Sequence, residues 1–410
     1  MILAPLLALA LLPGSAVEKR LAVLAPPEFR DPLEPLLSLR RAEGFGVEFV
    51  PLERGRASVG PETTHLLLVG DATRIPPGSF EDRRERVVSD ETPLPEGRGG
   101  PAIGRLPARD REEVSRLVAR LLRYERENPP GPWRARVLLT AGEGGFGWIA
   151  DRAIEAGARL AVEASLPAGF ELRLVRLSPG AAREAPALRR AFLSSLEPGA
   201  LFWVYAGHGS PDSLASGLGR GVLPAPPSRT VRSLGLADAG AVRCGERAPV
   251  ALLFACETAR IEPGRVCLAE ALLRGGEGPI AVLGAGGESH PYGDLAFALA
   301  LGRRIRADRE ARLGDLVAAA RRTLLVGAPE EPVLERGAAF FGIDEVERRR
   351  ILRRTALQYL LLGDPTLRVK IPSPLPLDVR LEAGGILVRG RLDGEGAGFV
   401  RIEVERPAGP

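Results

Sequence analysis

The sequence predicts an α/β protein with a largely parallel sheet flanked by helices. Three observations support this fold class. From Arg136 onward, short apolar runs alternate with segments of helical periodicity, which is typical of strand and helix alternation. Several runs are apolar throughout, as in strands covered on both faces. Hydrophobic residues make up 45% of the 410 residues and charged residues 26%, ordinary values for folded globular proteins. A chain of this length has room for two domains.

Residues 1–16 are predicted to be a signal peptide. Residues 1–12 are almost wholly apolar, and Gly14, Ser15 and Ala16 are small residues of the kind that signal peptidase accepts. No Lys or Arg precedes the apolar stretch, so a misassigned start or a short anchor would also account for it. No other stretch approaches the roughly 20 apolar residues of a membrane-spanning helix. We therefore expect a secreted or extracellular protein, with the periplasm or the cell surface as alternatives.

Residues 17–130 are expected to form an N-terminal α/β subdomain. Residues 75–100 are rich in Pro, Gly and charge, and predict a surface loop. Asp110, with Glu113 three residues on, predicts the start of a helix that stops before Pro129. Three short apolar runs predict strands, at residues 20–24, 47–50 and 64–69.

Residues 131–370 are expected to form a second α/β subdomain. Beyond residue 371 the pattern changes to short alternating strands with Gly turns, typical of the start of a β-sandwich. Residues 371–410 are few for an independent core, so this segment either docks on the preceding domain or is incomplete. In the second subdomain, strands are predicted at residues 137–140, 171–177, 201–207, 250–255 and 280–286, and helices near 151–165, 182–196 and 265–274.

Charge and cysteine content narrow the function classes. The net charge is +4, and the basic residues are scattered among acids, which argues against nucleic-acid binding. The three cysteines are an odd number, so at least one thiol is left over in an exported protein. Cys244, in a predicted loop, and Cys267, on the apolar face of a predicted helix, are expected to be packed in the core or simply exposed. No Cys-x-x-Cys pair suggests a metal site, and no cofactor is expected.

Two predicted strands end in reactive side chains. The strand at 201–207 runs into His208, and the strand at 250–255 runs into Cys256. If the strands are parallel neighbours, both side chains lie at one edge, where an imidazole can exchange a proton with a thiol. The backbone N–H groups of Gly209 and Cys256 could then bind an oxyanion. Taken singly, a buried packing thiol and a structural histidine are open alternatives; the coincidence favours a catalytic pair.

Further site residues are predicted around this pair. Glu143 follows a predicted strand and is the candidate to orient His208, with Asp151 as the weaker alternative. Asp212 is a second candidate for orienting this histidine or for contacting substrate. A solvated loop acid is the structural alternative in each case. The residues that follow the strand at 280–286 are expected to line the substrate cleft: Glu288, Ser289 and His290.

The order of these motifs resembles the gingipain-type cysteine peptidases, which share the caspase-like fold. His-Gly and Ala-Cys at strand ends are the signature of the wider clan. The more specific pieces are THLLLVGDAT at 64–73, AIGRLPARDREEVSRLVARLLRYERE at 102–127, WRARVLL at 133–139, VCLAEALL at 266–273, PIAVLGAG at 279–286 and YLLLGDPTLRV at 359–369.

The resemblance implies an extracellular enzyme that hydrolyses peptide bonds through a thioester acyl-enzyme on Cys256, with His208 protonating the leaving amine. It makes residues 131–370 the catalytic subdomain and implies a β-sandwich after it. Some relatives bind a structural calcium, and many cleave after Arg or Lys. The sequence departs from the family pattern in two places: SPDSLASGLG at 210–219 lacks the usual Trp, and ETARIE at 257–262 lacks the Gly expected soon after the cysteine.

Two alternatives stand beside this hypothesis. GEGGFG at 142–147 matches the glycine fingerprint for dinucleotides, but the strand at 171–177 ends without the acid that would hold the ribose. The stronger rival is a catalytically inactive caspase-like protein that binds a partner through the former active-site cleft. The presence of both His208 and Cys256 favours the enzyme.

Overall fold

A computed structural model describes residues 19–91, 100–127, 129–142, 169–177, 185–217, 230–327, 331–372, 377–382 and 385–390, together with residues 156, 159, 163 and 166. The predicted signal peptide and most of the helix expected at 151–165 lie outside these residues.

The centre of the fold is a ten-stranded sheet in the order β2-β1-β3-β6-β15-β14-β13-β9-β7-β8. All neighbouring strands are parallel except β14 and β15, which pair antiparallel. The sheet therefore consists of two parallel blocks that run in opposite directions, and the predicted fold class is confirmed. The strands are β1 (Arg20–Ala25), β2 (Gly46–Pro51), β3 (His65–Val69), β6 (Ala102–Leu106), β7 (Arg136–Gly142), β8 (Glu171–Leu177), β9 (Phe202–Ala206), β13 (Val250–Phe254), β14 (Ala281–Ala285) and β15 (Tyr359–Leu362).

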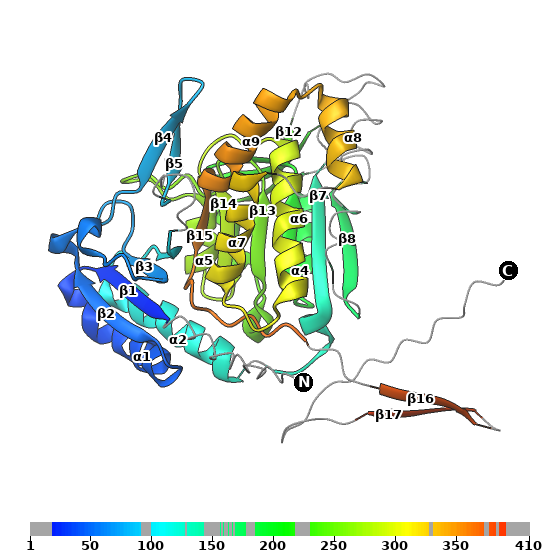
Figure 1. Ribbon diagram of the computed structural model, residues 1–410, viewed down its shortest axis with the longest axis horizontal. Coiled ribbons are helices and arrows are strands. Elements are labelled where there is room, and N and C mark those ends of the chain that lie inside the picture. The colour runs from blue at the N-terminus through cyan, green and yellow to red at the C-terminus, as the bar shows by residue number, and fades with distance from the viewer. Residues whose placement is uncertain are drawn as a thin grey trace, which may run out of the picture.

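The apolar runs form strands because the sheet is covered on both faces. Strands β3, β13, β14 and β15 are buried at every position, as expected for continuous apolar sequence. Figure 1 shows helices in front of the sheet and behind it, so neither face has to be polar.

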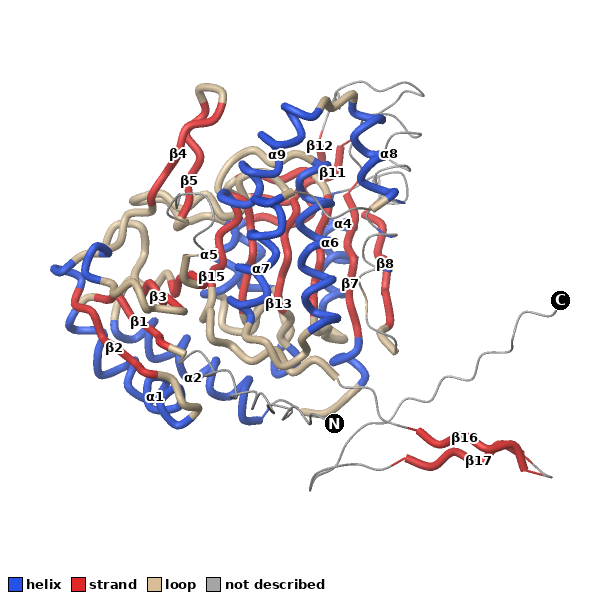
Figure 2. Tube along the Cα trace, in the orientation of Figure 1, coloured by secondary structure: helices blue, strands red, loops and turns tan. Residues whose placement is uncertain are grey.

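The helices follow the strands closely, as in other α/β folds. In Figure 1, α6 (Pro291–Ala307) and α7 (Leu313–Val326) lie in front of the sheet, with α4 (Ala185–Leu196) and α5 (Leu268–Arg274) behind it. The tube in Figure 2 shows α8 (Pro332–Phe341) and α9 (Glu345–Gln358) at the upper end. Helices α1 (Arg30–Ala42) and α2 (Arg111–Glu127) pack together beside the N-terminal strands. None of the helices within the described ranges is long and apolar enough to cross a membrane.

The start of α2 confirms the sequence prediction. The carboxylate of Asp110 accepts a hydrogen bond of 2.8 Å from the backbone N–H of Glu113, which satisfies one of the free donors of the first turn. The helix ends at Glu127, before Pro129.

A hairpin replaces part of the loop predicted at residues 75–100. Strands β4 (Gly78–Asp82) and β5 (Glu85–Ser89) pair antiparallel, so the prediction of irregular structure was wrong there. The two turn residues, Arg83 and Arg84, have φ of 48° and 68°. Tight hairpin turns with two positive φ angles usually contain Gly, Asn or Asp. Two consecutive arginines do not indicate a hairpin turn in the sequence.

Two smaller sheets complete the architecture. Strands β10 (His208–Ser210), β11 (Ser213–Gly217) and β12 (Thr230–Gly235) form a three-stranded antiparallel sheet just after β9. Strands β16 (Leu377–Glu382) and β17 (Gly385–Gly390) form an antiparallel hairpin, as the change of pattern after residue 371 predicts. Whether this hairpin begins a β-sandwich stays a prediction.

Buried ion pairs explain two of the quoted motifs. In LGDP, Asp364 accepts a hydrogen bond of 2.7 Å from Arg40. In GRLP, Arg105 makes two hydrogen bonds, of 2.8 and 2.6 Å, to Asp90. All four side chains are buried. Burial alone would raise the pKa of the Asp364 carboxyl, but the Arg40 guanidinium outweighs it and keeps the pKa below its usual value. These motifs therefore hold the scaffold together.

Candidate active site

The register of two strands places the predicted catalytic pair. Strand β9 pairs in parallel with β13, with Ala206 opposite Phe254. His208 and Cys256 each follow two residues later, so they leave the sheet at the same edge. The phenol of Tyr205 donates a hydrogen bond of 3.0 Å to the His208 carbonyl and holds the backbone there. Both His208 and Cys256 are half-buried.

Gly209 brings the two strand ends close together. A Cβ atom at this position would lie 2.7 Å from the carbonyl oxygen of Cys256 and 2.8 Å from the Cβ of Ala255. Both distances are shorter than real Cβ contacts, so only glycine fits without displacement of the backbone. The residue that follows His208 therefore lies directly against the residue that carries the thiol.

The thiol of Cys256 is held by the loop that follows β14. The backbone N–H of Ser289 donates a hydrogen bond of 3.3 Å to the sulfur, and the Ser289 hydroxyl lies 3.8 Å from it. Burial raises the pKa of the Cys256 thiol, and the charges of Asp294 and Glu288 add to this effect. The thiol is therefore protonated at neutral pH, and its attack on a substrate requires a base.

A buried acid lies behind Ser289. The Ser289 hydroxyl donates a hydrogen bond of 2.9 Å to Asp294, and the phenol of Tyr359 donates one of 2.7 Å to its other oxygen. Burial raises the pKa of Asp294 to about 7. Sequence reasoning named Ser289 but missed Asp294 and Tyr359, because an acid in the first turn of α6 looks like any solvated helix acid.

The same loop is fixed from its other side by the β4–β5 hairpin and α9. Glu85 accepts a hydrogen bond of 3.0 Å from the backbone N–H of Glu288, and Arg354 donates one of 2.8 Å to the Glu288 carbonyl. Arg354 also bridges to Glu85 and Asp82. Glu288 is exposed, so its backbone is anchored while its side chain faces solvent.

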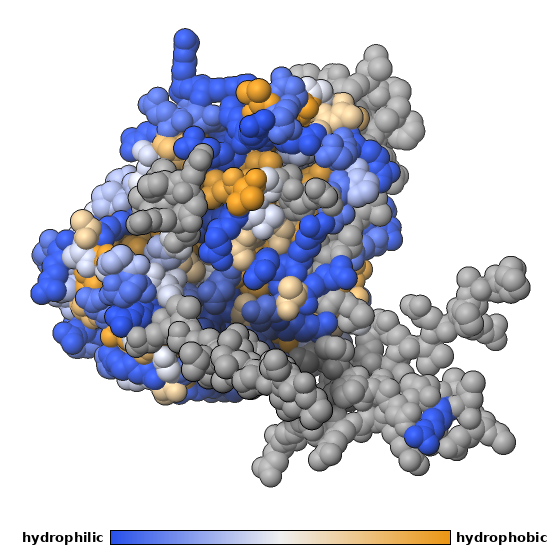
Figure 3. Space-filling view, viewed as in Figure 1, coloured by the Kyte–Doolittle hydropathy of each residue, from blue (hydrophilic) through white to orange (hydrophobic). Residues whose placement is uncertain are grey.

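His290 is the N-cap of α6 and contacts an aromatic pair. Its Nδ1 accepts a hydrogen bond of 3.1 Å from the backbone N–H of Tyr292, and burial lowers the pKa of its ring. The ring meets Phe341 edge-on at 5.4 Å, and Phe341 meets Phe340 at 5.0 Å. Figure 3 shows apolar atoms over the upper helices on a mostly hydrophilic face. The exposed large apolar side chains of this part of the chain are Leu325 and Val326 at the end of α7, Phe340 and Phe341 at the end of α8, and Val346 at the start of α9.

The residue after Cys256 has an unusual backbone. Glu257 has a φ of 57°, in the left-handed region that favours glycine. Its N–H donates to the Gly287 carbonyl at 3.0 Å, and its carboxylate pairs with Arg260. The family resemblance leads one to expect a glycine soon after the cysteine. Here a glutamate adopts the glycine-like conformation.

The remaining candidates are placed differently. Asp212 accepts hydrogen bonds of 2.6 and 3.2 Å from Ser210 and Ser213, so it stabilises the turn between β10 and β11. The Ser210 hydrogen bond lowers the pKa of its carboxyl. Glu143 lies outside the described residues, as does nearly all of the GEGGFG segment. The role of Glu143 in orienting His208 stays a prediction.

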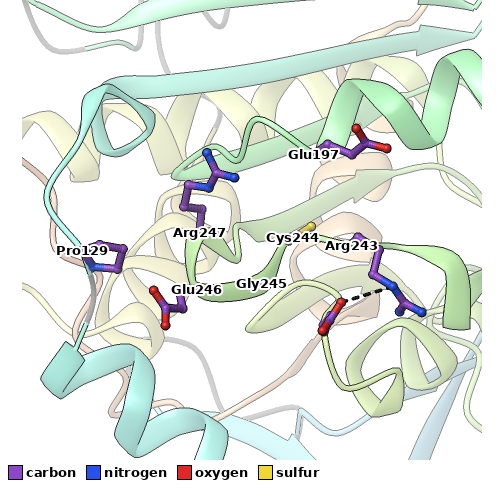
Figure 4. A pocket seen from close by; sticks show the side chains of 8 residues that line it. Pro129, Glu197, Arg243, Cys244, Gly245, Glu246 and Arg247 are labelled. Atoms are coloured by element: carbon purple, nitrogen blue, oxygen red, sulfur yellow. Dashed lines mark ion pairs between the residues drawn. The ribbon is translucent and has the colours of Figure 1, made fainter.

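A hollow of about 530 Å³ lies away from these residues, at the opposite edge of the parallel block that contains β9 and β13. Figure 4 shows the charged side chains around it, where Arg243 forms an ion pair of 3.2 Å with Glu277. The Cys244 thiol is buried in its wall, and burial raises its pKa to about 12. The lining residues precede strands instead of following them: Pro129, Glu197, Arg243, Cys244, Gly245, Glu246, Arg247 and Glu277. Within the described ranges, no group of three or more His, Cys, Asp or Glu side chains could hold a metal ion.

Comparisons with known proteins identify the family and the fold of this chain. The model of peptidase family C25 matches residues 16–370. The fold is similar to the crystal structure of the Arg specific cysteine proteinase gingipain R (RgpB), with a TM-score of 0.63, 16% identity, and coverage of 89% of this chain and 82% of that chain. A complex of the Porphyromonas gingivalis RgpB pro- and mature domains matches with a TM-score of 0.60, 15% identity, and coverage of 88% and 82%.

At these identities the structural likeness concerns the fold, and no curated protein matches the sequence. The family match spans most of the chain and confirms the resemblance seen in the motifs. The chain belongs to peptidase family C25, the gingipain family, and is a cysteine-type peptidase that acts on peptides or proteins.

Proposed function

We propose that this peptidase is a secreted endopeptidase that cleaves peptide bonds through a thioester on Cys256, with His208 as the proton-transfer partner. The observation that carries the proposal is the shared register of β9 and β13. It brings the imidazole and the thiol to one sheet edge, with Gly209 against the Cys256 backbone.

The chemistry follows from the protonated thiol. His208 takes the thiol proton as the sulfur of Cys256 bonds to the substrate carbonyl carbon. The developing oxyanion is held by the N–H groups of Gly209 and Cys256, each worth about 3 kcal/mol in such sites. The C–N bond then breaks, and His208 returns its proton to the leaving amine. Water attacks the resulting thioester while His208 accepts its proton. The C–S bond then breaks, the acid product leaves, and His208 returns the proton to the sulfur of Cys256.

We place the substrate along the loop after β14. Ser289 touches the sulfur of Cys256, and His290 adjoins Phe341, so an extended peptide bound there would run from the nucleophile past an aromatic surface. The exposed carboxylate of Glu288 lies within the same loop. Asp212 contributes through the β10–β11 turn next to His208. Glu143 is the proposed third member, which orients the imidazole.

Export through cleavage after residue 16 is part of the proposal. The support is the apolar stretch at residues 1–12 followed by small residues. N-terminal sequencing of protein recovered from the medium tests it, and a mature chain that begins near residue 17 is expected. Full-length protein retained on cells would instead indicate an anchor.

The decisive experiment is hydrolysis of a peptide library by the chain without residues 1–16 under reducing conditions, with any pro-segment removed. Cys256→Ala and His208→Ala should each reduce kcat by several orders of magnitude. Cys244→Ala is the matched control, because Cys244 is buried at the opposite edge of the sheet, and it should retain activity. A folded chain that cuts nothing would instead favour a protein that binds a partner through the former cleft.

A further inference from the structure

A chain of hydrogen bonds runs from the nucleophile into the core. The Ser289 hydroxyl lies 3.8 Å from the sulfur of Cys256 and 2.9 Å from Oδ2 of Asp294. Oδ1 of Asp294 accepts a hydrogen bond of 2.7 Å from Tyr359. A serine hydroxyl has only one proton. It can therefore be given to the carboxylate or to the sulfur, but not to both.

The charge of Asp294 decides which of these bonds forms. When the carboxyl is ionised it can only accept, so both Ser289 and Tyr359 donate to it. When Oδ2 is protonated, its O–H donates to the Ser289 oxygen, and the Ser289 proton is released towards Cys256. A hydrogen bond to sulfur favours the thiolate. The loss of a nearby negative charge favours it as well.

We propose that Asp294 is a positioning residue that, through Ser289, sets how readily Cys256 forms a thiolate. The inference rests on the proposed function, since it takes Cys256 as the nucleophile. The carboxyl itself does not touch the substrate. It acts by orienting the Ser289 hydroxyl and by the presence or absence of its own charge.

Burial makes this acid able to change charge near neutral pH, because it raises the pKa of Asp294 to about 7. Below that pH the carboxyl is neutral and the thiolate is favoured; above it, the carboxylate opposes the thiolate. The two ionisations are therefore linked, and each raises the pKa of the other group.

Several charged groups on the helices around α6 form ion pairs away from Asp294. The ring of His290, one turn before Asp294, accepts from the Tyr292 backbone. On the helices that surround α6, the pairs are Arg321 of α7 with Glu91, Glu335 of α8 with Arg348 of α9, and Arg354 of α9 with Glu85 and Asp82. Among the described residues, the hydrogen-bond partners of the Asp294 carboxyl are thus Ser289 and Tyr359.

The test is the rate at which iodoacetamide alkylates Cys256 between pH 5 and pH 9, followed by peptide mass mapping of the chain without residues 1–16. In the wild-type protein the rate should rise by less than tenfold per pH unit around pH 7, because the thiolate competes with the Asp294 carboxylate. In Asp294→Asn the amide donates to Ser289 and accepts from Tyr359, which mimics the neutral acid. The rise per pH unit around pH 7 should then be steeper than in wild type, with rates at pH 8 about three- to tenfold above wild type, equivalent to up to about one pKa unit. His208 and Glu288, other titratable groups near the thiol, are the same in both proteins, so the difference between the two profiles isolates Asp294.

Two further variants make the test specific. Ser289→Ala keeps the backbone N–H on the sulfur but removes the hydroxyl, so the effect of Asp294→Asn should be smaller in that background. Tyr359→Phe removes a donor to the carboxylate, and should move the flattened region to higher pH. Asp308→Asn, at the far end of α6, is the control and should leave the profile unchanged.

A folded Asp294→Asn protein with the wild-type alkylation profile would overturn the inference. If that variant does not fold, an unshifted profile in Tyr359→Phe has the same meaning. Neither result bears on the peptidase proposal, which depends on peptide cleavage and on its loss in Cys256→Ala and His208→Ala. Conversely, alkylation can be measured whether or not a substrate is known.

Discussion

Gly209 lies against the backbone of Cys256, and a Cβ atom at position 209 would come within 2.7 Å of the Cys256 carbonyl oxygen. The ends of β9 and β13 can approach each other only because position 209 has no side chain. The separation of His208 from Cys256 is therefore controlled by a residue that has no side chain.

Gly209→Ala should push these strand ends apart. We expect kcat/KM to fall by at least about a hundredfold, because displacements of an ångström at reacting groups have effects of this size. Gly240→Ala is the control, since a Cβ there meets nothing within 4 Å. Peptide hydrolysis beside thermal unfolding checks the prediction. Full activity in Gly209→Ala would show that the close approach is not needed.

Substitutions at position 257 should differ in stability according to how well the new residue tolerates a positive φ angle. Glu257→Val should destabilise the fold by about 2 kcal/mol, because a β-branched residue is strained at a φ of 57°. Glu257→Gly should remain within about 1 kcal/mol of wild type, since relief of the left-handed conformation offsets the greater freedom of glycine in the unfolded chain. Denaturant titration measures both free energies of unfolding. Equal losses in the two variants would contradict this account.

The buried pair Arg40–Asp364 should dominate the acid sensitivity of the scaffold. Asp364→Asn leaves a buried guanidinium without one of its charge partners, and should cost about 3 to 5 kcal/mol. The exposed acid of the Glu112–Arg116 pair offers the control, because Glu112→Gln should change stability by less than about 1 kcal/mol.

The pH dependence of this pair has a definite sign. The folded pKa of Asp364 lies below its usual value, because the attraction of Arg40 outweighs burial. The pair therefore contributes stability above the unfolded pKa of about 4, and this is lost as pH falls through the folded pKa. Between pH 6 and pH 2, the free energy of unfolding should decrease more steeply for wild type than for Asp364→Asn. The same pH dependence of the free energy of unfolding in both proteins would contradict this role of the Arg40–Asp364 pair.

Arg354 should matter for activity more than for stability. It donates to the Glu288 carbonyl at 2.8 Å and bridges to Glu85, so Arg354→Met should loosen the loop that holds the Cys256 sulfur. We expect kcat/KM to fall about tenfold. Arg349→Met is the control, because Arg349 is exposed on the same helix and pairs locally with Glu345. Equal activity in the two variants would exclude a role in holding the loop.

Sequence reasoning succeeded where local pattern and tertiary structure agree. The buried strands are continuous apolar runs, and the parallel order that such runs predict brings positions 208 and 256, at the ends of β9 and β13, to the same edge of the sheet. It failed where long-range contacts decide. Nothing near Tyr359 shows that β15 runs antiparallel to β14, and nothing near Asp294 shows that Ser289 and Tyr359 will meet its carboxyl. The β4–β5 hairpin escaped prediction because its turn contains Arg83 and Arg84.

The position of β15 also determines when the central sheet can be completed during synthesis of the chain. This strand joins the two blocks of the sheet, yet it is formed by residues 359–362, after all the other strands of that sheet have been synthesised. During synthesis on the ribosome, the two parallel blocks cannot be joined through β15 until residues 359–362 have left the ribosome. Strand pairings between segments so distant in sequence also form slowly. Tyr359, the partner of Asp294, arrives in the same segment. The surroundings of the proposed nucleophile are therefore complete only late in synthesis. We expect a nascent chain to gain peptidase activity only after nearly all of residues 131–370 have been synthesised.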